Sequence, residues 1–126
     1  MLPYSPIAGG ILSGKYNNGF IPENSRFSDY IGHPTKRIRV HAKRFYNEKT
    51  LNATAEFIEI AKKYDLSPVT LAVAYSKQFD FVASTIIGAR NAAQLDDSLK
   101  AADLRLSREI MLDLKRLRER HLYPMG

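Results

Sequence analysis

An apolar run that ends in a glycine, within residues 81–98, most constrains what this chain can form. The stretch reads FVASTIIGARNAAQLDDS, and its apolar positions include Phe81, Val82, Ile86 and Ile87. This β-branched composition favours a parallel strand covered on both faces over an antiparallel strand with one wet face. Gly88 ends the run at a point where the backbone turns tightly or lets a ligand approach. The stretch therefore predicts a buried strand followed by a sharp turn.

The residues after this turn predict a helix over residues 91 to about 101. Asn91 is a favoured N-cap, and Gln94 stands three residues later, at the capping-box position. A helix N-terminus offers free N–H groups and the positive end of the helix dipole, which suits an anion. Arg90 adds a guanidinium fork that matches phosphate. An ordinary junction with a solvated arginine explains the same residues, so the pattern alone leaves both interpretations open.

A second pattern of the same kind opens the chain. Residues 2–4 predict the end of a strand, and residues 5–10 form a loop of small residues that ends in paired glycines. Such a loop lets backbone N–H groups come close to a bound group. Residues 19–46 are polar and irregular, which predicts a long loop with a functional or mobile character.

The second half of the chain is predicted to be rich in helices. Apolar residues recur at helical spacing from about residue 47 to residue 64. Ser67 followed by Pro68 predicts the start of a second helix, and Ser107 caps a last helix. Two parallel strands alone leave open edges and uncovered faces. The pattern therefore predicts a piece of a larger α/β sheet or barrel, able to associate through its open strand edges.

Composition narrows the classes of protein that need consideration. The chain has 126 residues, 44% of them hydrophobic and 25% charged, as in ordinary soluble domains. The formal charge is +6, and basic residues gather at positions 36–44, which can steer an anion such as a dinucleotide. The chain has no cysteine, which excludes disulfides and cysteine-bound metals. We expect a cytoplasmic protein without a membrane partner.

Two motifs resemble those of the aldo-keto reductase family. They are YSPIAGGILSGKY at residues 4–16 and IGARNAAQL at residues 87–95. The resemblance covers essentially the whole chain and is nearest to the bacterial-type branch, which also resembles the potassium-channel β-subunits. It implies an α/β fold in which this chain is the C-terminal quarter of a (β/α)8 TIM barrel. That quarter would comprise strands seven and eight with the helices that follow them, incomplete as a barrel.

The resemblance also implies a site for NADP(H). Family positions that follow the nicotinamide, the pyrophosphate and the adenosine carry over one residue at a time. They are Tyr4, Ser5, Pro6, Ile7, Ala8, Gly10, Lys15, Arg26, Gly88, Arg90, Gln94 and Asp97. Arg90 implies a partner for the 2′-phosphate, and so NADP(H) over NAD(H). Ser98 and Asn24 depart from the family's asparagine and tyrosine, which implies looser adenine contacts.

The family's catalytic residues do not carry over to this chain. The resemblance places the Asp, Tyr, Lys and His set, with Tyr as the proton donor, on earlier strands. A full-length parent would reduce aldehydes and ketones to alcohols, whereas this chain alone is expected to be inactive. His33, His41 and His121 are predicted to be surface residues, and no spacing indicates metal ligands.

Two other functions were weighed against this one. A non-catalytic interaction protein that senses NADP(H) on the same scaffold fits the sequence equally well. A helix-turn-helix over residues 51–78 would indicate nucleic acid as a partner. The second helix opens with Pro68, Val69, Leu71 and Ala72, which favour a core over base contacts, so nucleic acid is not predicted.

Overall fold

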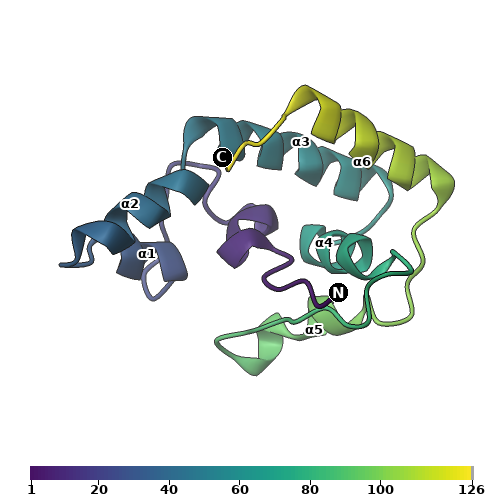
Figure 1. Ribbon diagram of the computed structural model, residues 1–126, viewed down its shortest axis with the longest axis horizontal. Helices are drawn as coiled ribbons and strands as arrows, with labels where there is room; N and C mark the ends of the chain where they lie inside the picture. Colours follow the sequence, from purple (N-terminus) through teal and green to yellow (C-terminus); the bar gives the residue numbers. More distant parts are fainter. Residues whose placement is uncertain (126) are drawn as a thin grey trace.

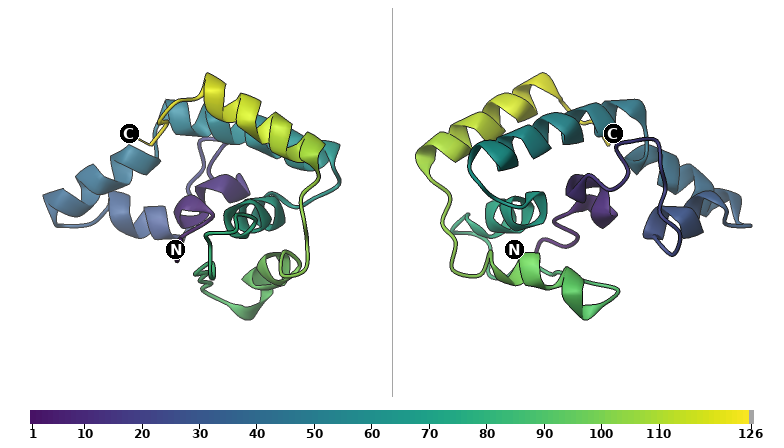
Figure 2. Two further views of the ribbon diagram at one scale, coloured as in Figure 1. Left: turned by 45° about the vertical axis from the view of Figure 1, so that its right-hand side comes forward. Right: turned by 180° about the vertical axis from the view of Figure 1, so that it is seen from behind.

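The computed structural model describes residues 1–125 and is built mainly of helices (Figure 1). In chain order they are η1 (Ala8–Ser13), α1 (Arg26–Ile31), α2 (Lys36–Phe45), α3 (Glu48–Lys63), α4 (Pro68–Lys77), η2 (Ala92–Gln94), α5 (Asp96–Leu99) and α6 (Arg108–Arg120). Helices α3 and α6 lie side by side in every view, and α1 and α2 form one end of the molecule (Figure 2). Within the described residues, no helix has the length and hydrophobicity needed to span a membrane.

The larger of two cores lies between α3, α4 and α6. Its buried members are Phe57, Ala61, Leu71, Ala72, Val73, Ala74, Ala101, Leu106, Ile110, Leu114 and Leu117. Three side chains start these helices: Asn47, Ser67 and Ser107 each accept the backbone N–H three residues later. The sequence prediction of these three helices is confirmed, as is the burial of Leu71 and Ala72 at the start of α4.

The smaller core joins η1 to the α1–α2 end of the molecule. Its buried members are Ala8, Ile11, Tyr16, Phe27 and Ala42. The Tyr16 and Phe27 rings meet edge to face, with centroids 5.2 Å apart. The chain end returns to this core: the Pro124 carbonyl accepts the Thr50 hydroxyl at 2.8 Å, and Met125 packs against the cluster.

The prediction that residues 19–46 form a loop is wrong, because they contain α1 and α2. Ser25 and Ser28 form a capping box at the start of α1. Phe27 is only 2% exposed, so burial of its ring fixes this helix against the smaller core. Helices α1 and α2 form because the few apolar residues of this polar stretch pack against apolar residues from outside it.

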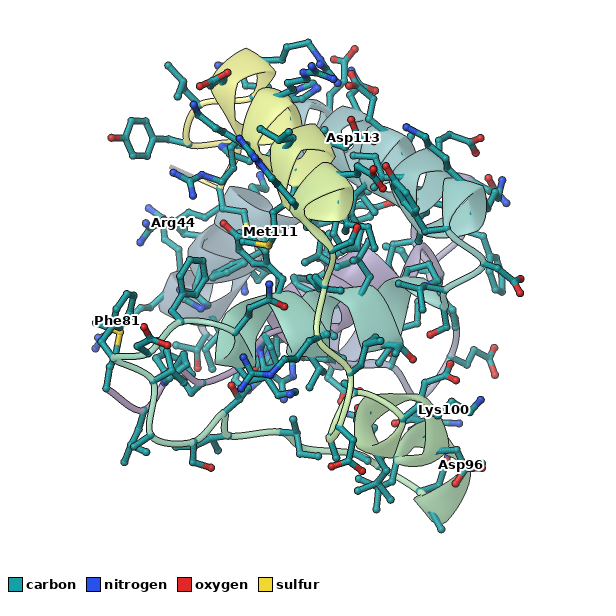
Figure 3. All side chains as sticks on the ribbon, turned by 90° about the vertical axis from the view of Figure 1, so that its right-hand side faces the viewer. Arg44, Phe81, Asp96, Lys100, Met111 and Asp113 are labelled. Carbon is teal, nitrogen blue, oxygen red and sulfur yellow. The ribbon has the colours of Figure 1, made fainter. Side chains whose placement is uncertain are left out.

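The two predicted strands are also wrong. Residues 1–5 and 81–86 run side by side, joined by an isolated parallel bridge between Tyr4 and Ile86. The Pro3 carbonyl accepts the Ile86 N–H at 2.8 Å, and the Met1 carbonyl accepts the Ala83 N–H at 2.9 Å. Phe81 is 61% exposed and projects from the ribbon in Figure 3, so the apolar run is not buried as predicted.

The expected fold class is corrected by the same observation. The residues that the structure describes contain no sheet, and the C-terminal quarter of a (β/α)8 TIM barrel with strands seven and eight is not seen. A buried parallel strand needs neighbours on both sides and cover on both faces. Here each segment has one neighbour, and a two-stranded pair is marginal in water. The pairing therefore stops at a single bridge.

The helix predicted over residues 91–101 is broken into η2 and α5. Asn91 caps η2 as predicted, accepting the Gln94 N–H at 3.1 Å. The Gln94 side chain accepts the N–H of Arg90, one residue before the expected capping-box position. The Asp97 carbonyl accepts the Thr70 hydroxyl of α4 at 2.7 Å, so this carbonyl serves tertiary packing instead of a longer helix.

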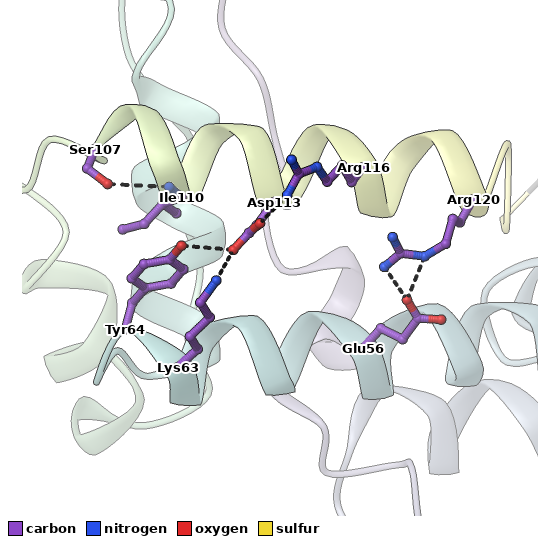
Figure 4. A network of polar contacts seen from close by, with 8 residues as sticks. All are labelled: Glu56, Lys63, Tyr64, Ser107, Ile110, Asp113, Arg116 and Arg120. Atoms are coloured by element: carbon purple, nitrogen blue, oxygen red, sulfur yellow. Dashed lines mark hydrogen bonds and ion pairs between the residues drawn. The ribbon is translucent and has the colours of Figure 1, made fainter.

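Polar side chains link α3 to α6 along the outer surface (Figure 4). Asp113 accepts hydrogen bonds from Lys63 at 2.7 Å and from the Tyr64 hydroxyl at 2.8 Å. These two bonds, Lys63 first, hold the pKa of Asp113 below its ordinary value. At the C-terminal end of α6, Arg120 is paired with Glu56 of α3 at 2.6 Å, and this pairing lowers the pKa of Glu56.

We predict that Asp113→Asn flattens the acid side of the stability curve. A carboxyl whose pKa is lowered by folding stabilises the protein above its unfolded pKa, about 3.9. That stabilisation is lost as the pH falls through the lower folded pKa. The variant should be less stable than the wild type at neutral pH and equally stable once Asp113 is protonated.

Urea unfolding at a series of pH values measures this effect. Asp103→Asn is the matched control, since it removes an exposed carboxylate of the same chain region that makes no ion pair within residues 1–125. Parallel curves for the wild type and Asp113→Asn would contradict the role of this pairing.

Candidate functional site

A cleft of about 350 Å³ opens where the two glycine motifs meet. Most of its lining residues come from the two motif segments. The others are Ile86, Arg26 of α1, Val73 of α4 and Ser98 of α5. They are Tyr4, Ser5, Pro6, Ile7, Gly9, Gly10, Lys15, Arg26, Val73, Ile86, Ile87, Gly88, Ala89, Arg90, Gln94 and Ser98. The structure thus brings together all of the predicted cofactor-binding residues except Ala8 and Asp97.

The Tyr4–Ile86 bridge sets the relation between the two walls of the cleft. The Ser5 N–H donates to the Ile86 carbonyl at 3.3 Å, directly before each segment turns. Tyr4 and Gly88, which the resemblance assigns to one cofactor site, therefore lie at the same end of the paired segments, joined by one bridge and not by neighbouring strands. The Tyr4 ring is 81% exposed, so one face is free for contact.

The first loop follows a left-handed path at its glycine pair. Gly9 has φ +67° and Gly10 has φ +99°, a region that glycine adopts without strain. A Cβ added to Gly10 would lie 3.0 Å from Cε of Lys15, so the lysine side chain lies closely over this glycine. The pair is needed for the turn and for the close approach of Lys15.

The N–H groups of this loop are used within the loop itself. The Gly9 N–H donates to the Ser5 hydroxyl at 3.0 Å, and the Gly10 N–H donates to the Ile7 carbonyl at 2.9 Å. The Ala8 N–H donates to the Ser5 carbonyl at 2.8 Å. The loop therefore offers side chains and close backbone approach, whereas the sequence predicted that its N–H groups come close to a bound group.

Three cations give the cleft its charge. Lys15 and Arg26 lie beside the first loop, and Arg90 lies in the second. Lys15 Nζ is 5.1 Å from the centroid of the Tyr16 ring, a cation–π distance. The lining contains no carboxylate. An anionic ligand is therefore the charge class that this cleft favours.

Arg90 is held by groups outside the cleft. Its guanidinium donates to the Asn24 carbonyl and to the Asp29 carboxylate, and its side chain is 48% exposed. The sequence allows a solvated Arg90 or a phosphate-bound one, and neither interpretation includes this pairing with Asp29. Asp29 lies in α1, within the stretch predicted as a loop. No sequence pattern near Arg90 or Asp29 predicts that the two residues are in contact.

Two predicted residues lie away from the cleft. Ala8 is buried in the smaller core. The Asp97 carboxylate pairs with Lys100 at 3.0 Å, and this bond, followed by one to Ser67, lowers the pKa of Asp97. Six lining residues were absent from the predicted set: Gly9, Val73, Ile86, Ile87, Ala89 and Ser98. Three of them lie within the two motifs, Ile86 directly precedes the second motif, and Ser98 stands at a family adenine position, which were the available signals. Val73 had none.

No histidine lines the cleft. The His33 Nδ1 accepts the Thr35 N–H at 3.1 Å, His41 is exposed beside Phe45, and the His121 ring is 2.7 Å from Glu56. Within residues 1–125, no group of three histidine or acidic side chains is placed to hold a metal ion. The chemistry that these residues offer is anion binding.

Comparison with known proteins identifies the family. A model of the Aldo/keto reductase family matches residues 1–119. The chain belongs to this family. The resemblance drawn from the motifs at residues 4–16 and 87–95 is confirmed at the level of the family.

Several aldo/keto reductase relatives match over most of this chain. Protein tas of Escherichia coli strain K12 is 31% identical over 98% of the chain. A probable voltage-gated potassium channel subunit beta of Arabidopsis thaliana is 32% identical over 80%, and L-glyceraldehyde 3-phosphate reductase of E. coli strain K12 is 31% identical over 79%. The matches cover 33%, 29% and 28% of these relatives, so the chain spans about a third of their length.

Proposed function

We propose that residues 1–126 are the C-terminal portion of an NADP-dependent aldo/keto reductase and form its NADP(H)-binding part. The observation that supports this is the meeting of both family motifs in one cleft with Lys15, Arg26 and Arg90. The full-length parent would reduce a small aldehyde or ketone to an alcohol. One relative is named as a reductase of L-glyceraldehyde 3-phosphate, which is consistent with a carbonyl substrate.

The cleft residues fit a phosphorylated dinucleotide. Such a ligand carries several negative charges, and three cations with no carboxylate face the space it would take. Ile86, Ile87 and Val73 add apolar surface for its rings. Pockets of a few hundred cubic ångströms with mostly apolar walls and a few placed polar groups are typical of cofactor sites. When bound, NADPH supplies a hydride.

The roles of this chain's own residues follow from their positions. Lys15 and Arg26 offset the charge of phosphate groups beside the first loop, and Arg90 does so at the second. The exposed Tyr4 ring presents a face for stacking. The Ser5 hydroxyl accepts the Gly9 N–H and so holds the loop in shape. All of these groups bind and orient, and none is placed as a proton donor to a carbonyl oxygen.

The parent's remaining chain would supply the proton-transfer residues and cover the exposed apolar side chains. Met1, Leu2, Tyr4, Phe81 and Ile86 are each more than half exposed along the paired segments. Apolar side chains gathered in this way mark a contact surface. We propose that the chain alone associates through this surface.

A second candidate is a non-catalytic protein that binds NADP(H) and acts through contacts with a partner. The observation that favours it is a cofactor-type cleft whose lining has neither a histidine nor a carboxylate. Relatives named as potassium channel subunits are in accord with it. Activity measurements on a parent protein separate the two candidates.

The chain alone should not oxidise NADPH in the presence of an aromatic aldehyde such as a nitrobenzaldehyde. A positioned general acid typically contributes about 10²–10⁴-fold to the rate, and the cleft lacks one. Following the absorbance of NADPH tests this expectation. Turnover of the purified 126-residue chain at the rate of an intact reductase would show that the proton donor lies within it.

Arg90→Ala should weaken NADPH binding by about 10-fold and leave NADH binding nearly unchanged. A hydrogen bond to a charged group contributes roughly 1.5–3 kcal/mol, and about 1.4 kcal/mol corresponds to tenfold, so a half-exposed arginine belongs at the low end. Isothermal titration of both cofactors measures the difference. Arg105→Ala removes an exposed cation that does not line the cleft and serves as control. Equal losses for both cofactors would leave Arg90 without a role at the 2′-phosphate.

A further inference from the structure

The contact that holds Arg90 joins the two sides of the cleft rim. Arg90 and its two acceptors, Asn24 and Asp29, are 66 and 61 positions apart in the sequence. We call this contact the Arg90 clasp. It connects the loop that follows Ile86 to the start of α1, which also contributes Arg26 to the cleft.

The acceptor side of the clasp is firmly positioned. The Ser28 N–H donates to the Ser25 hydroxyl at 3.3 Å, and the Ser25 N–H donates back to the Ser28 hydroxyl at 3.0 Å. Phe27, which lies between Ser25 and Ser28 in sequence, is 2% exposed in the smaller core. The Asp29 carboxylate is therefore presented by a capped and anchored helix turn, and its position does not depend on Arg90 alone.

The clasp distinguishes Arg90 from the other cations of the cleft. Among residues 1–125, Arg90 is ion-paired with Asp29, whereas Lys15 and Arg26 make no ion pair. An anion that approaches Arg90 meets a guanidinium whose Nη atoms already serve two acceptors. To gain those donors it must displace the carboxylate, and the displaced carboxylate then lies beside a like charge.

We propose that Asp29 is a specificity-determining residue that opposes the 2′-phosphate of the cofactor. Its carboxylate occupies Arg90 in the free protein, which lowers the affinity for NADPH and leaves that for NADH unaffected. Asp29 thereby reduces the preference for NADPH over NADH that Arg90 creates. This inference rests on the proposed NADP(H) function. In the same site, the Asp29 carboxylate competes with the 2′-phosphate for Arg90.

Asp29→Asn tests the inference, because it removes the charge and keeps the size of the side chain. Isothermal titration should show NADPH binding about 3- to 10-fold tighter than in the wild type, with NADH changed by less than about 2-fold, since only NADPH gains a freed guanidinium. Asp29→Ser is a second variant with the same expectation. The gain should vanish when Arg90→Ala is combined with Asp29→Asn.

Glu23→Gln is the matched control. It removes one negative charge from the same exposed segment, and Glu23 does not contact Arg90. A gain for Asp29→Asn that Glu23→Gln reproduces would reflect net charge and would overturn the inference.

Carboxyl NMR gives a second measurement. Saturation of the wild type with NADPH should shift the Asp29 carboxyl signal more than saturation with NADH, because only NADPH displaces this carboxylate from Arg90. Unchanged NADPH affinity in Asp29→Asn, or weaker binding of both cofactors, overturns the inference and leaves the proposed function standing. If neither the wild type nor Asp29→Asn binds NADPH, both the function and the inference fail.

Discussion

Four backbone hydrogen bonds between residues 1–5 and 81–86 determine whether this molecule has a site at all. The first joins the Met1 amino group to the Phe81 carbonyl at 2.7 Å, and the last joins the Ser5 N–H to the Ile86 carbonyl at 3.3 Å. They bring together segments that are some eighty positions apart in the chain. Closing so long a loop costs conformational entropy, and a few exposed bonds do not offset it alone. Ile7 and Ile87 pack against the larger core beneath, which supplies the remaining stabilisation.

The cleft therefore depends on helices that contribute little or nothing to its lining. Helix α4 packs against η1 and α5 and lies between the two walls, contributing Val73 to the lining. Helices α3 and α6 hold α4 in place through the larger core, and the Asp113 and Glu56 networks hold α3 against α6 (Figure 4). The cationic side chains of the cleft are thus positioned by the apolar packing of the two cores.

The sequence predicted correctly those helix starts that depend on contacts between residues close together in the chain. Ser67 and Ser107 cap helices that form where their caps begin, because a side-chain oxygen satisfies an N–H three residues later in the same segment. The paired segments could not be predicted in the same way. An apolar run forms a buried strand only if other segments cover it, and Phe81 has no such cover among the described residues.

The sequence predicted which residues form the candidate site better than it predicted the contacts that these residues make. The resemblance to the family assigned both motifs to one site, and the residues of both motifs do line one cleft. The pairing of Arg90 with Asp29 was not predicted, because it joins two turns from distant parts of the chain. Asp97 was predicted at the site, but its carboxylate pairs with Lys100 within its own short helix, where a local partner is nearer.

Residues 124 and 125 support a part of the molecule that lies far from them in sequence. The Pro124 carbonyl accepts the Thr50 hydroxyl, and Met125 adds its side chain to the cluster that contains Phe27. Loss of these two contacts would strip cover from that cluster without touching the cleft. Because Phe27 anchors the turn that presents Asp29, it would also loosen the carboxylate side of the cleft rim.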